Sequence, residues 1–589
     1  MKKIIFIIFI TLFSIVLVSC QSTAQDPTLP SDLPTIPSDL VEPTTPDDTD
    51  WNEQTYTSMS FLENTVIASD YSGIQVSSTA VAFVKGGIYV LSGSYTKTLI
   101  VSAPDSEVRL VFNNLEINSS QGSSLIVLDA EKVILDIQEG TDNYITDSSN
   151  YGYTDSNLLK VDAAIYSKAD LVISGTGSLS ITANYNDGIK ANDALIMSEV
   201  NLTIHSVDDA ITVNDSISIE SGNFNLFAGG DAIKVSNDNI EKGEIFILGG
   251  NFFIDSFNDG LQSSSYILIQ GGVFEIIAGD GYNAFLATDQ SSKGIKATLG
   301  IEISGGTIEI DSADDAIHSD ALVSIVGGTI TIKTGEKGIH SDNSFTISDG
   351  TVTIENSFEG IEAKNTVISG GFLDIYSIDD GINGSDPEID SAEAPLPNET
   401  PDSSLSTAVF EITGGVLIIE SSDDAIDING IIYQKGGIIV INGPVSGTQS
   451  AVDYDLGWVV TGGTLIGVAG YGNETKAPSE SSTQLSVVYN TQTIRSAGTT
   501  VSLMDADNNL IFAFTPTKSY QAIIMISPEL IQNSNYSIYL GGTITGSIEN
   551  GYYEDAVLEG ATLLKTITLS LIVNTYNITS SSPSRPPRP

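Results

Sequence analysis

The residues best suited to chemistry in this sequence are aspartates that recur in short polar segments. Four of them, Asp187, Asp208, Asp209 and Asp231, fall in three successive segments, and Asp215 lies in the same repeat as Asp208. Calcium takes about six to eight oxygen ligands, and carboxylates are among its usual ligands in proteins. Stacked carboxylates would repel one another unless a cation lay between them. The pattern therefore predicts a calcium site, although aspartate also favours tight turns that hold no metal.

A second acidic group lies further along the chain and is divided by an acidic, proline-rich insertion. It comprises Asp379, Asp380, Asp423 and Asp424. The same reasoning predicts a second calcium site in this group. Asp314 and Asp315 differ, because they stand between segments that carry Lys293 and Lys337. Ion pairs with these lysines would compete with a metal there.

Basic residues follow the same kind of segment. Lys190, Lys234 and Lys296 each come directly after the isoleucine that closes a segment. They would either neutralise the acidic segments or contact the carboxylates of an acidic sugar. His318 and His340 occupy the same position in two later segments. Two histidines fall short of the ligand set of a zinc site, so we interpret them as a surface pair.

All these segments belong to a repeat with a nearly constant period. The small residue before the isoleucine recurs at Gly294, Ala316, Gly338, Gly360 and Gly381, in steps of 22, 22, 22 and 21 residues. Within a repeat, apolar and polar residues alternate, which indicates strands with one buried face. Three short strands and three turns fill one repeat, so each repeat closes one coil. We therefore predict an all-β fold, a right-handed parallel β-helix (solenoid) with strands stacked on strands.

Stacking would align equivalent residues of successive coils. The residue after each isoleucine is polar and should point outward, whereas the next residue is small or apolar and should point inward. The isoleucines themselves are predicted to lie inside: Ile189, Ile211, Ile233, Ile317, Ile339 and Ile361.

The N-terminal segment has the pattern of an export signal. Residues 1–19 begin with two lysines and continue with an apolar run that is short for a membrane span. The run ends in Leu-Val-Ser-Cys, which resembles a bacterial lipobox and predicts lipidation of Cys20, the only cysteine. Residues 20–50 are rich in Pro, Thr, Ser and Asp and predict a disordered tether. We therefore expect an exported protein, anchored by lipid on the extracytoplasmic face of the bacterial cell membrane.

The rest of the chain divides into regions that differ in composition and in the regularity of the repeat. We predict irregular first coils over 51–160, regular coils over 161–475 with insertions near 279–292 and 385–407, a small C-terminal β cap over 476–579, and a disordered tail over 580–589.

The net charge of −52 arises from 75 acidic and 23 basic residues. This charge excludes nucleic acid as a partner, since phosphate recognition needs a positive surface. It is compatible with cation binding, and also with simple solubility of an exported protein. We expect the protein to be a monomer.

Several stretches together carry a family resemblance. They are GIYVLSG (87–93), LVFNNLEINSSQG (110–122), NYNDGIKANDAL (184–195), the DDAI turns and AFTPTKSYQAIIMISPEL (513–530). Their order and joint presence resemble bacterial exported carbohydrate-binding-domain proteins, whose β-helix is similar to that of the family-nine pectate lyases. The resemblance implies Ca²⁺ sites on the helix and binding of plant cell-wall polysaccharide, including acidic polygalacturonate. Proteins of this type are described as binders rather than as established enzymes.

Three functions follow as alternatives. The first is a surface lipoprotein that binds acidic polysaccharide through calcium and through Lys190, Lys234 and Lys296. The second is a calcium-dependent polysaccharide lyase, in which Lys234 would abstract a proton from a uronate whose carboxylate calcium holds. The third is a structural adhesin in which the solenoid serves as a spacer.

Overall fold

The computed structural model describes most of the chain after residue 53. The described residues are 35–37, 40, 51, 54–153, 158, 160–287, 290–386, 407–472, 475–546, 551–553 and 556–577. The predictions made for residues 1–19, Cys20 and 580–589 lie outside these ranges, as do most of those for the tether and for the insertion near 385–407. Every regular element in the described ranges longer than a single turn is a β-strand. In this part of the chain, no helix is long and apolar enough to cross a membrane.

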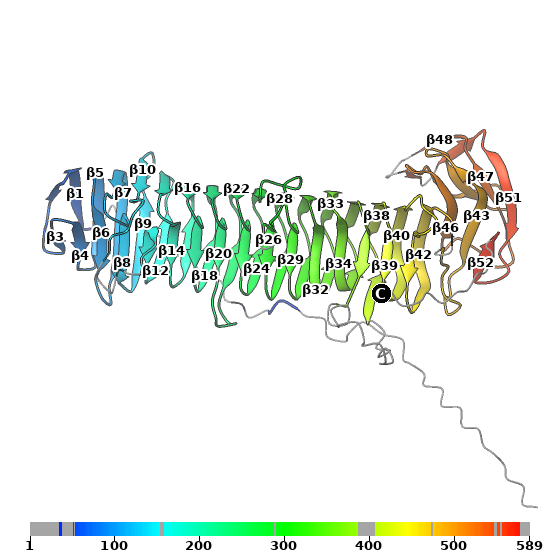
Figure 1. The fold of residues 1–589 in the computed structure, drawn as a ribbon, viewed down its shortest axis with the longest axis horizontal. Helices are drawn as coiled ribbons and strands as arrows, with labels where there is room; N and C mark the ends of the chain where they lie inside the picture. The colour runs from blue at the N-terminus through cyan, green and yellow to red at the C-terminus, as the bar shows by residue number, and fades with distance from the viewer. Residues whose placement is uncertain are drawn as a thin grey trace, which may run out of the picture.

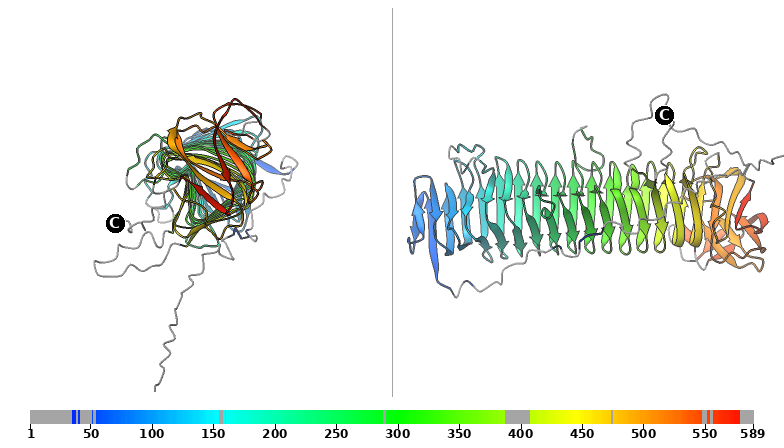
Figure 2. Two further views of the ribbon diagram at one scale, coloured as in Figure 1. Left: turned by 90° about the vertical axis from the view of Figure 1, so that its right-hand side faces the viewer. Right: turned by 90° about the horizontal axis from the view of Figure 1, so that it is seen from below.

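The strands form one long solenoid in which successive coils pair in parallel, and this confirms the predicted parallel β-solenoid (Figure 1). The strand pairings form three series, so the coils present three faces. Figure 2 shows the solenoid from its C-terminal end and from below. The first face consists of β4 (Ala80–Phe83), β6 (Thr98–Ser102), β8 (Leu125–Asp129), β11 (Ala163–Ser167), β14 (Asp187–Ala191), β17 (Ile211–Val213), β20 (Ile233–Val235), β23 (Leu261–Ser263), β26 (Ile295–Ala297), β29 (Ile317–Ser319), the start of β32 (Lys337–Ile347), the start of β34 (Glu359–Ile368), β36 (Ile382–Gly384), β39 (Ile426–Ile428) and β41 (Asp453–Tyr454).

The other two faces are built in the same way. The second contains β9 (Lys132–Ile137), β12 (Asp170–Ser174), β15 (Leu195–Ser198), β18 (Ser216–Ile219), β21 (Glu244–Ile247), β24 (Tyr266–Ile269), β27 (Gly300–Ile303), β30 (Leu322–Ile325), the ends of β32 and β34, β37 (Ala408–Ile412), and the starts of β40 (Gly430–Asn442) and β42 (Gly457–Ala469). The third contains β10 (Asp142–Thr146), β13 (Ser178–Ala183), β16 (Val200–Ser206), β19 (Gly222–Ala228), β22 (Asn251–Ser256), β25 (Val273–Ala278), β28 (Thr307–Ser312), β31 (Thr329–Thr334), β33 (Thr351–Asn356), β35 (Phe372–Ser377), β38 (Val416–Ser421) and the ends of β40 and β42.

The interior consists of apolar side chains stacked along the solenoid axis. The six isoleucines predicted to lie inside, Ile189 to Ile361, are all fully buried, so the predicted register is confirmed. Phe224, Phe252 and Phe274 stack face to face in three coils, with ring centroids 4.8 and 4.5 Å apart. Each buried isoleucine or phenylalanine contributes about 1.5–3 kcal/mol relative to an exposed one. A one-residue slip of a strand would move its whole apolar set outside, which is why the stacking register is strongly specified.

The two ends of the chain have their own strands. At the N-terminal end, β1 (Tyr56–Glu63) pairs in parallel with β5 (Gly87–Tyr95), which pairs with β7 (Glu107–Asn118); β2 (Thr65–Ala68) and β3 (Ile74–Val76) add antiparallel pairs.

At the other end, β46 (Tyr520–Ile526) runs antiparallel to both β42 and β43 (Ser486–Arg495), and β52 (Val573–Tyr576) joins β43. A separate five-stranded sheet holds β44 (Val501–Met504), β45 (Leu510–Phe514), β47 (Asn535–Leu540), β49 (Tyr552–Tyr553) and β51 (Thr562–Thr568), and a two-stranded sheet holds β48 (Thr543–Thr545) and β50 (Val557–Glu559).

Candidate functional site

Two rows of polar side chains run along the first face, one in the turns before the strands and one on the strands. We name the first the turn ladder: Asp187, Asp209, Asp231, Asp259, Lys293, Asp315, Lys337, Glu359, Asp380 and Asp424. We name the second the outer ladder: Lys190, Thr212, Lys234, Gln262, Lys296, His318, His340, Glu362, Asn383, Asp427 and Asp453. Turn-ladder and outer-ladder residues of one coil are three positions apart in the sequence wherever both occur.

The turn-ladder aspartates tie each coil to the next through the backbone. Asp209 Oδ1 accepts the backbone N–H of Asp231 at 2.7 Å, and Asp231 Oδ1 accepts that of Asp259 at 2.9 Å. Asp259 does the same for Lys293, at 2.8 Å. A buried backbone N–H without a partner is costly, so this bond gives aspartate a structural reason to recur here. One carboxylate oxygen is used in this way, and the other faces the outer ladder.

In the N-terminal coils, outer-ladder lysines pair with those remaining oxygens. Lys234 Nζ lies 2.6 Å from Asp231 Oδ2 and 3.5 Å from Asp209 Oδ2, so it bridges two coils. Lys190 Nζ bridges Asp162 and Asp187 in the same manner, at 2.8 and 3.3 Å. The carboxylates of these pairs are largely buried, and an ammonium group takes the place where a bound cation would lie between coils.

Lys296 also pairs with a turn-ladder aspartate, since its Nζ lies 3.3 Å from Asp259 Oδ2. The five aspartates predicted as the first calcium site are therefore not gathered into one compact cluster. Asp215 lies directly before β18 and pairs with Lys242 at 2.5 Å. Asp208 sits beside Asp209, and burial together with the Asp209 charge raises the pKa of its carboxyl group. Sequence reasoning listed the lysines as sugar contacts or as neutralising groups, and the observed distances match the second role.

The environment of Lys234 bears on the lyase alternative. Burial opposes its charged form, but hydrogen bonds and charge from Asp231 and Asp209 raise the pKa of Lys234 above its ordinary value. A lysine with a raised pKa carries its proton at neutral pH. A general base must be deprotonated near the working pH, so this environment is the opposite of what proton abstraction requires.

In the coils from Lys293 to Glu362, the turn ladder and the outer ladder contain both basic and acidic side chains. Lys293 Nζ contacts the Asp314 carboxylate and lies 3.7 Å from Asp315 Oδ2, as expected for ion pairs there. Lys337 Nζ pairs with Glu362, 3.0 Å away, rather than with the aspartates. His318 and His340 do stack in adjacent coils, with ring centroids 4.6 Å apart.

The C-terminal coils hold the densest group of carboxylates on the first face. One oxygen each of Asp379, Asp380 and Asp423 lies within 4.8 Å of the others, and the same holds for Asp424, Asp427 and Asp453. We call these six residues the C-terminal carboxylate cluster. In the part of the chain that the structure describes, Asp380 and Asp424 form no ion pair with a basic side chain, whereas Lys476 contacts Asp453.

Burial and mutual repulsion of the carboxylates raise the pKa values of Asp380 and Asp424 in this cluster. Burial, reinforced by the carboxylates of Asp427, Asp424, Asp379 and Asp423, raises the pKa of Asp380 to about 9. Burial also raises the pKa of Asp424 to about 7, against the backbone N–H of Ser450, which favours the carboxylate. Half-buried carboxylates in close contact are stable as anions only when a cation compensates them. Of the four aspartates predicted as the second calcium site, Asp379, Asp380 and Asp423 form one group, and Asp424 belongs to the other.

Sequence reasoning missed two members of this cluster, Asp427 and Asp453, as ligands. Asp453 aligns with Asp427 in the strand register of β39 and β41. A signal was present, because Ala451-Val452-Asp453 repeats the small–apolar–polar pattern of Ala425-Ile426-Asp427. Asp427 and Asp453 are 26 residues apart, whereas the repeat has a period of 22, so a search with a constant period does not find Asp453.

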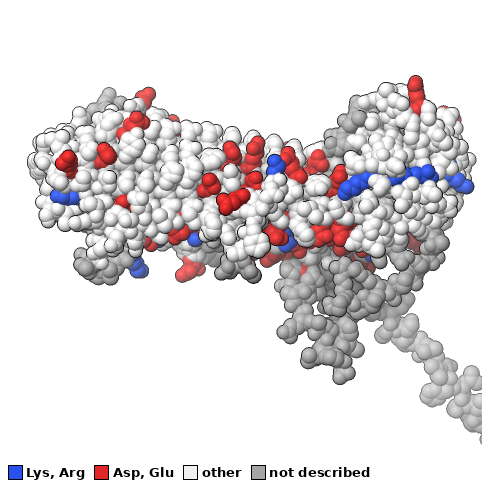
Figure 3. Space-filling view, turned by 45° about the horizontal axis from the view of Figure 1, so that its top comes forward, with Lys and Arg blue, Asp and Glu red and all other residues white. Residues whose placement is uncertain are grey.

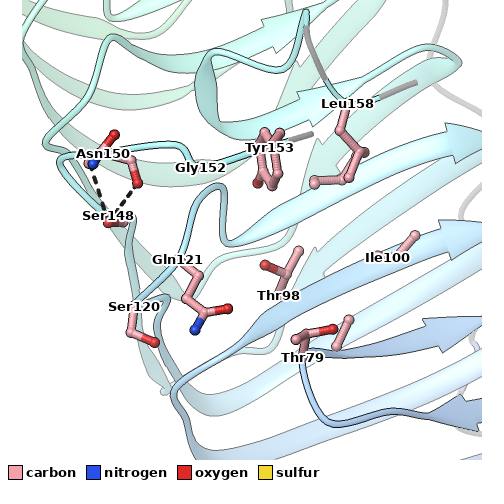
Figure 4. A pocket seen from close by; sticks show the side chains of 12 residues that line it. Thr79, Thr98, Ile100, Ser120, Gln121, Ser148, Asn150, Gly152, Tyr153 and Leu158 are labelled. Atoms are coloured by element: carbon pink, nitrogen blue, oxygen red, sulfur yellow. Dashed lines mark hydrogen bonds between the residues drawn. The ribbon is translucent and has the colours of Figure 1, made fainter. Parts of the chain in front are cut away.

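Two hollows on the solenoid could accept a sugar. The first, of about 500 Å³, lies over the N-terminal coils and is lined by Thr79, Ala80, Thr98, Ile100, Ser120, Gln121, Ile126, Ser148, Asn150, Gly152, Tyr153 and Leu158. Thr98, Gln121 and Tyr153 surround the space in Figure 4. The Tyr153 ring is held in place, since its Oη accepts the backbone N–H of Ser123 at 2.7 Å.

The second hollow, of about 390 Å³, lies on the third face beside the exposed ring of His205 and the partly buried ring of Phe227. His205 of β16 and Phe227 of β19 stack with centroids 4.4 Å apart and planes 5° apart, and Phe253 follows 5.6 Å from Phe227. Asn184 and Asp255 line the same hollow. Tyr166 of β11 is buried.

Three tyrosines lie at or near the first hollow. Tyr151 stacks on Tyr185 at 4.2 Å with planes 14° apart, and meets Tyr153 edge to face at 5.4 Å. Figure 3 shows one side of the molecule, on which Asp and Glu gather over the middle of the solenoid and are sparser toward its N-terminal end.

Comparisons with known proteins bear on the same region. Residues 77–338 match the sequence model of a family described as carbohydrate-binding domain-containing protein. A protein of that description from Acetivibrio thermocellus is 32% identical over 146 residues, which are 24% of this chain and 51% of the relative. This chain thus spans about half the length of that relative. The resemblance noted in the sequence is confirmed for this region.

A solved structure, described as that of the polysaccharide lyase-like protein from C. thermocellum as a gadolinium derivative, is 30% identical. It covers 38% of this chain and 91% of its own, with a TM-score of 0.37.

Proposed function

We propose that this protein binds a polysaccharide on the outside of its solenoid and does not cleave it. The observation that carries the proposal is the match of residues 77–338 to a carbohydrate-binding family. Both hollows are lined by residues within that range. The binding surface we propose therefore comprises the first hollow and the ring strip of His205, Phe227 and Phe253.

The first hollow has the chemistry of a sugar subsite. Its lining is dominated by hydroxyl and amide side chains, which can exchange hydrogen bonds with sugar hydroxyls, and one wall carries the Tyr153 ring. Binding sites of this kind place a few fixed polar groups against an apolar surface. Gly122 contributes by its lack of a side chain, since a Cβ atom there would lie 2.2 Å from Tyr153 Oη.

The ring strip suits a polymer rather than a single sugar. His205, Phe227 and Phe253 come from three successive coils, and coils stack about 4.8 Å apart. A chain of sugars running along the solenoid axis would meet the outer edges of these rings one after another, with Asn184 and Asp255 at the side.

Calcium completes the proposal, at the C-terminal carboxylate cluster. Each of its two groups offers three carboxylates, the kind of oxygen ligand that Ca²⁺ takes. A net charge of −52 would repel an acidic polysaccharide, and calcium bound at the cluster would lower that repulsion. The lysines of the N-terminal coils are engaged in ion pairs, so they support a structural role more than direct recognition.

We also propose that the protein is held at the cell surface by lipid on Cys20. Support comes from the sequence alone, namely the basic start, the apolar run of residues 4–18 and the small residue before the cysteine. Cys20→Ser should release the protein from the membrane fraction. Unchanged fractionation of this variant would contradict the anchor.

The binding proposal is tested by measuring retention of the full chain on polygalacturonate and on a neutral glucan, with calcium and with chelator. Tyr153→Ala and Phe227→Ala should each weaken binding about fivefold to tenfold, which corresponds to roughly 1–1.4 kcal/mol. Phe285→Ala is the matched control, because Phe285 is 96% exposed, lies in the loop after β25 and lines neither hollow. Equal loss in all three variants, or none, would contradict the proposed surface. Unsaturated uronide products would show lyase activity instead.

A further inference from the structure

Asp315, His318 and His340 form a compact cluster on the first face, between two adjacent coils. His318 Nδ1 lies 2.9 Å from Asp315 Oδ2, and His340 Nδ1 lies 3.1 Å from the same oxygen. The strand register places the two histidines directly above one another, in β29 and β32. Three donor atoms of two chemical types therefore converge on one point, within 4.8 Å of one another.

The far nitrogen of each ring has its own carboxylate. His318 Nε2 lies 3.1 Å from Asp320 Oδ1, and His340 Nε2 lies 3.4 Å from Asp342 Oδ1. A carboxylate on the outer nitrogen is the usual support of a metal-binding histidine, since it orients the ring and makes the inner nitrogen a better donor. Here the same support occurs twice, in the same position of two coils, and both inner nitrogens point to one place.

The cluster is sheltered but reachable. The side chains of Asp315, His318 and His340 are 6%, 13% and 19% exposed. Asp315 Oδ1 is engaged by the backbone N–H of Lys337 at 3.1 Å, which leaves Oδ2 directed at the histidines. The charged groups that face the cluster from neighbouring coils are Lys293, 3.7 Å from Asp315 Oδ2, and Glu362, 3.8 Å from His340 Nε2.

We propose that Asp315, His318 and His340 bind one transition-metal ion of the zinc class, with a fourth position left to water or to a ligand. Two imidazole nitrogens and one carboxylate oxygen are a ligand set that zinc accepts and that calcium, which takes oxygen ligands, does not prefer. The ion would replace the protons that the Nδ1 atoms now share with Asp315. The site is separate from the C-terminal carboxylate cluster in both position and donor chemistry.

The sequence contains few other residues that could bind a transition metal, which simplifies a test of this site. The chain has three histidines and one cysteine, so few other residues could bind such an ion. The third histidine, His205, stacks on Phe227 on the third face and serves as the matched control. Because Co²⁺ in a tetrahedral site absorbs visible light, it reports both binding and geometry without any assay of function.

The experiment titrates the full chain with Co²⁺ and then with Zn²⁺, in the presence of excess calcium. We expect one tetrahedral Co²⁺ per chain, displaced by one equivalent of Zn²⁺. His318→Ala and His340→Ala should each weaken Zn²⁺ binding at least about a hundredfold, whereas His205→Ala should leave it unchanged. Asp320→Asn, which alters only the support of His318, should weaken binding about tenfold to a hundredfold.

Several results would overturn the proposal. They are the absence of stoichiometric Co²⁺ or Zn²⁺ binding to the unmodified chain, an equal loss in the His205→Ala control, or displacement of the ion by calcium. Circular dichroism of each variant separates loss of the site from loss of the fold, and the titration of the unmodified chain does not depend on any variant. Polysaccharide binding is not used as a readout, so failure of this site leaves the proposed function standing.

Discussion

The coils around Lys190 to Lys296 and the coils around Asp380 to Asp453 place side chains at the same backbone positions. In the first region the buried carboxylates are paired with lysines, whereas in the second region carboxylates lie beside carboxylates. In both, aspartates of the turn ladder sit between coils, and Asp209 and Asp424 each accept a backbone N–H from the next coil. In the N-terminal coils the outer ladder supplies lysines, whereas in the C-terminal coils it supplies Asn383, Asp427 and Asp453. The outer ladder, rather than the turns, therefore decides whether a stretch compensates its own charge.

The comparison also explains why similar acidic turns should differ in their response to calcium. Where Lys234 bridges Asp209 and Asp231, the ammonium group already stabilises the carboxylates. Where Asp380 has carboxylates as its main charged neighbours, its pKa rises to about 9. The calcium-free folded state is then destabilised when Asp380 is ionised. A divalent ion relieves that destabilisation in the second case and would have to displace lysines in the first.

The largest expected effect is that of calcium on stability. At a hundredfold excess over its Kd, an ion that binds only the folded state stabilises it by about 2.7 kcal/mol. Thermal melts with calcium and with chelator should therefore differ by several degrees. Asp380→Asn should remove most of the difference, and Asp209→Asn should keep it. A calcium response lost in Asp209→Asn and kept in Asp380→Asn would reverse the assignment.

The next effect concerns the compensated coils. Lys234→Ala removes the bridging ammonium and leaves the buried carboxylates of Asp231 and Asp209 without it. We expect a loss of about 1–3 kcal/mol, reduced from the value for a fully buried pair because Lys234 is 31% exposed. Denaturant unfolding measures it, with Lys333→Ala as the control, since Lys333 and Glu355 are both about half exposed. If the two variants lose the same stability, the bridging role is wrong.

A smaller effect should follow when the pattern of one stretch is transferred to the other. Asn383→Lys places a lysine three residues after Asp380, the spacing of Lys234 and Asp231. The new ion pair should raise the stability of the calcium-free protein by about 1 kcal/mol and reduce its calcium response. Asn383→Gln, which adds length without charge, is the control. A calcium response as large as that of the unmodified chain would show that charge compensation is not what separates the stretches.

The pH dependence in chelator is a separate signal, and its sign is set by Asp380. Its folded pKa of about 9 lies above the ordinary value, so the folded state holds the proton more tightly than the unfolded state. This contribution is fully present below about pH 4 and is lost as pH rises toward 9. Melts in chelator should therefore fall in temperature across this range, while calcium or Asp380→Asn flattens the curve. A rise with pH that depends on Asp380 would contradict the assignment.

The sequence by itself determined the coil and the direction of its side chains. The period of 22 residues and the strict alternation in stretches such as β31 are local properties, because side chains of a strand alternate whatever lies above it. The buried isoleucines, the polar outer ladder and the acidic turns followed from this alone. The carbohydrate-binding resemblance also rested on short stretches that keep their order along the chain.

Only the tertiary structure decided which side chains meet between coils. Lys296 reaches Asp259 across 37 positions because the loop after Gly279 is extruded, and Asp453 stacks on Asp427 although their step is 26 residues. Asp315 joins the two histidines because one carboxylate oxygen is held by the backbone and the other is left to face them. Such contacts depend on the few ångströms between neighbouring coils and on insertion lengths, which a pattern of residue types along one strand does not contain.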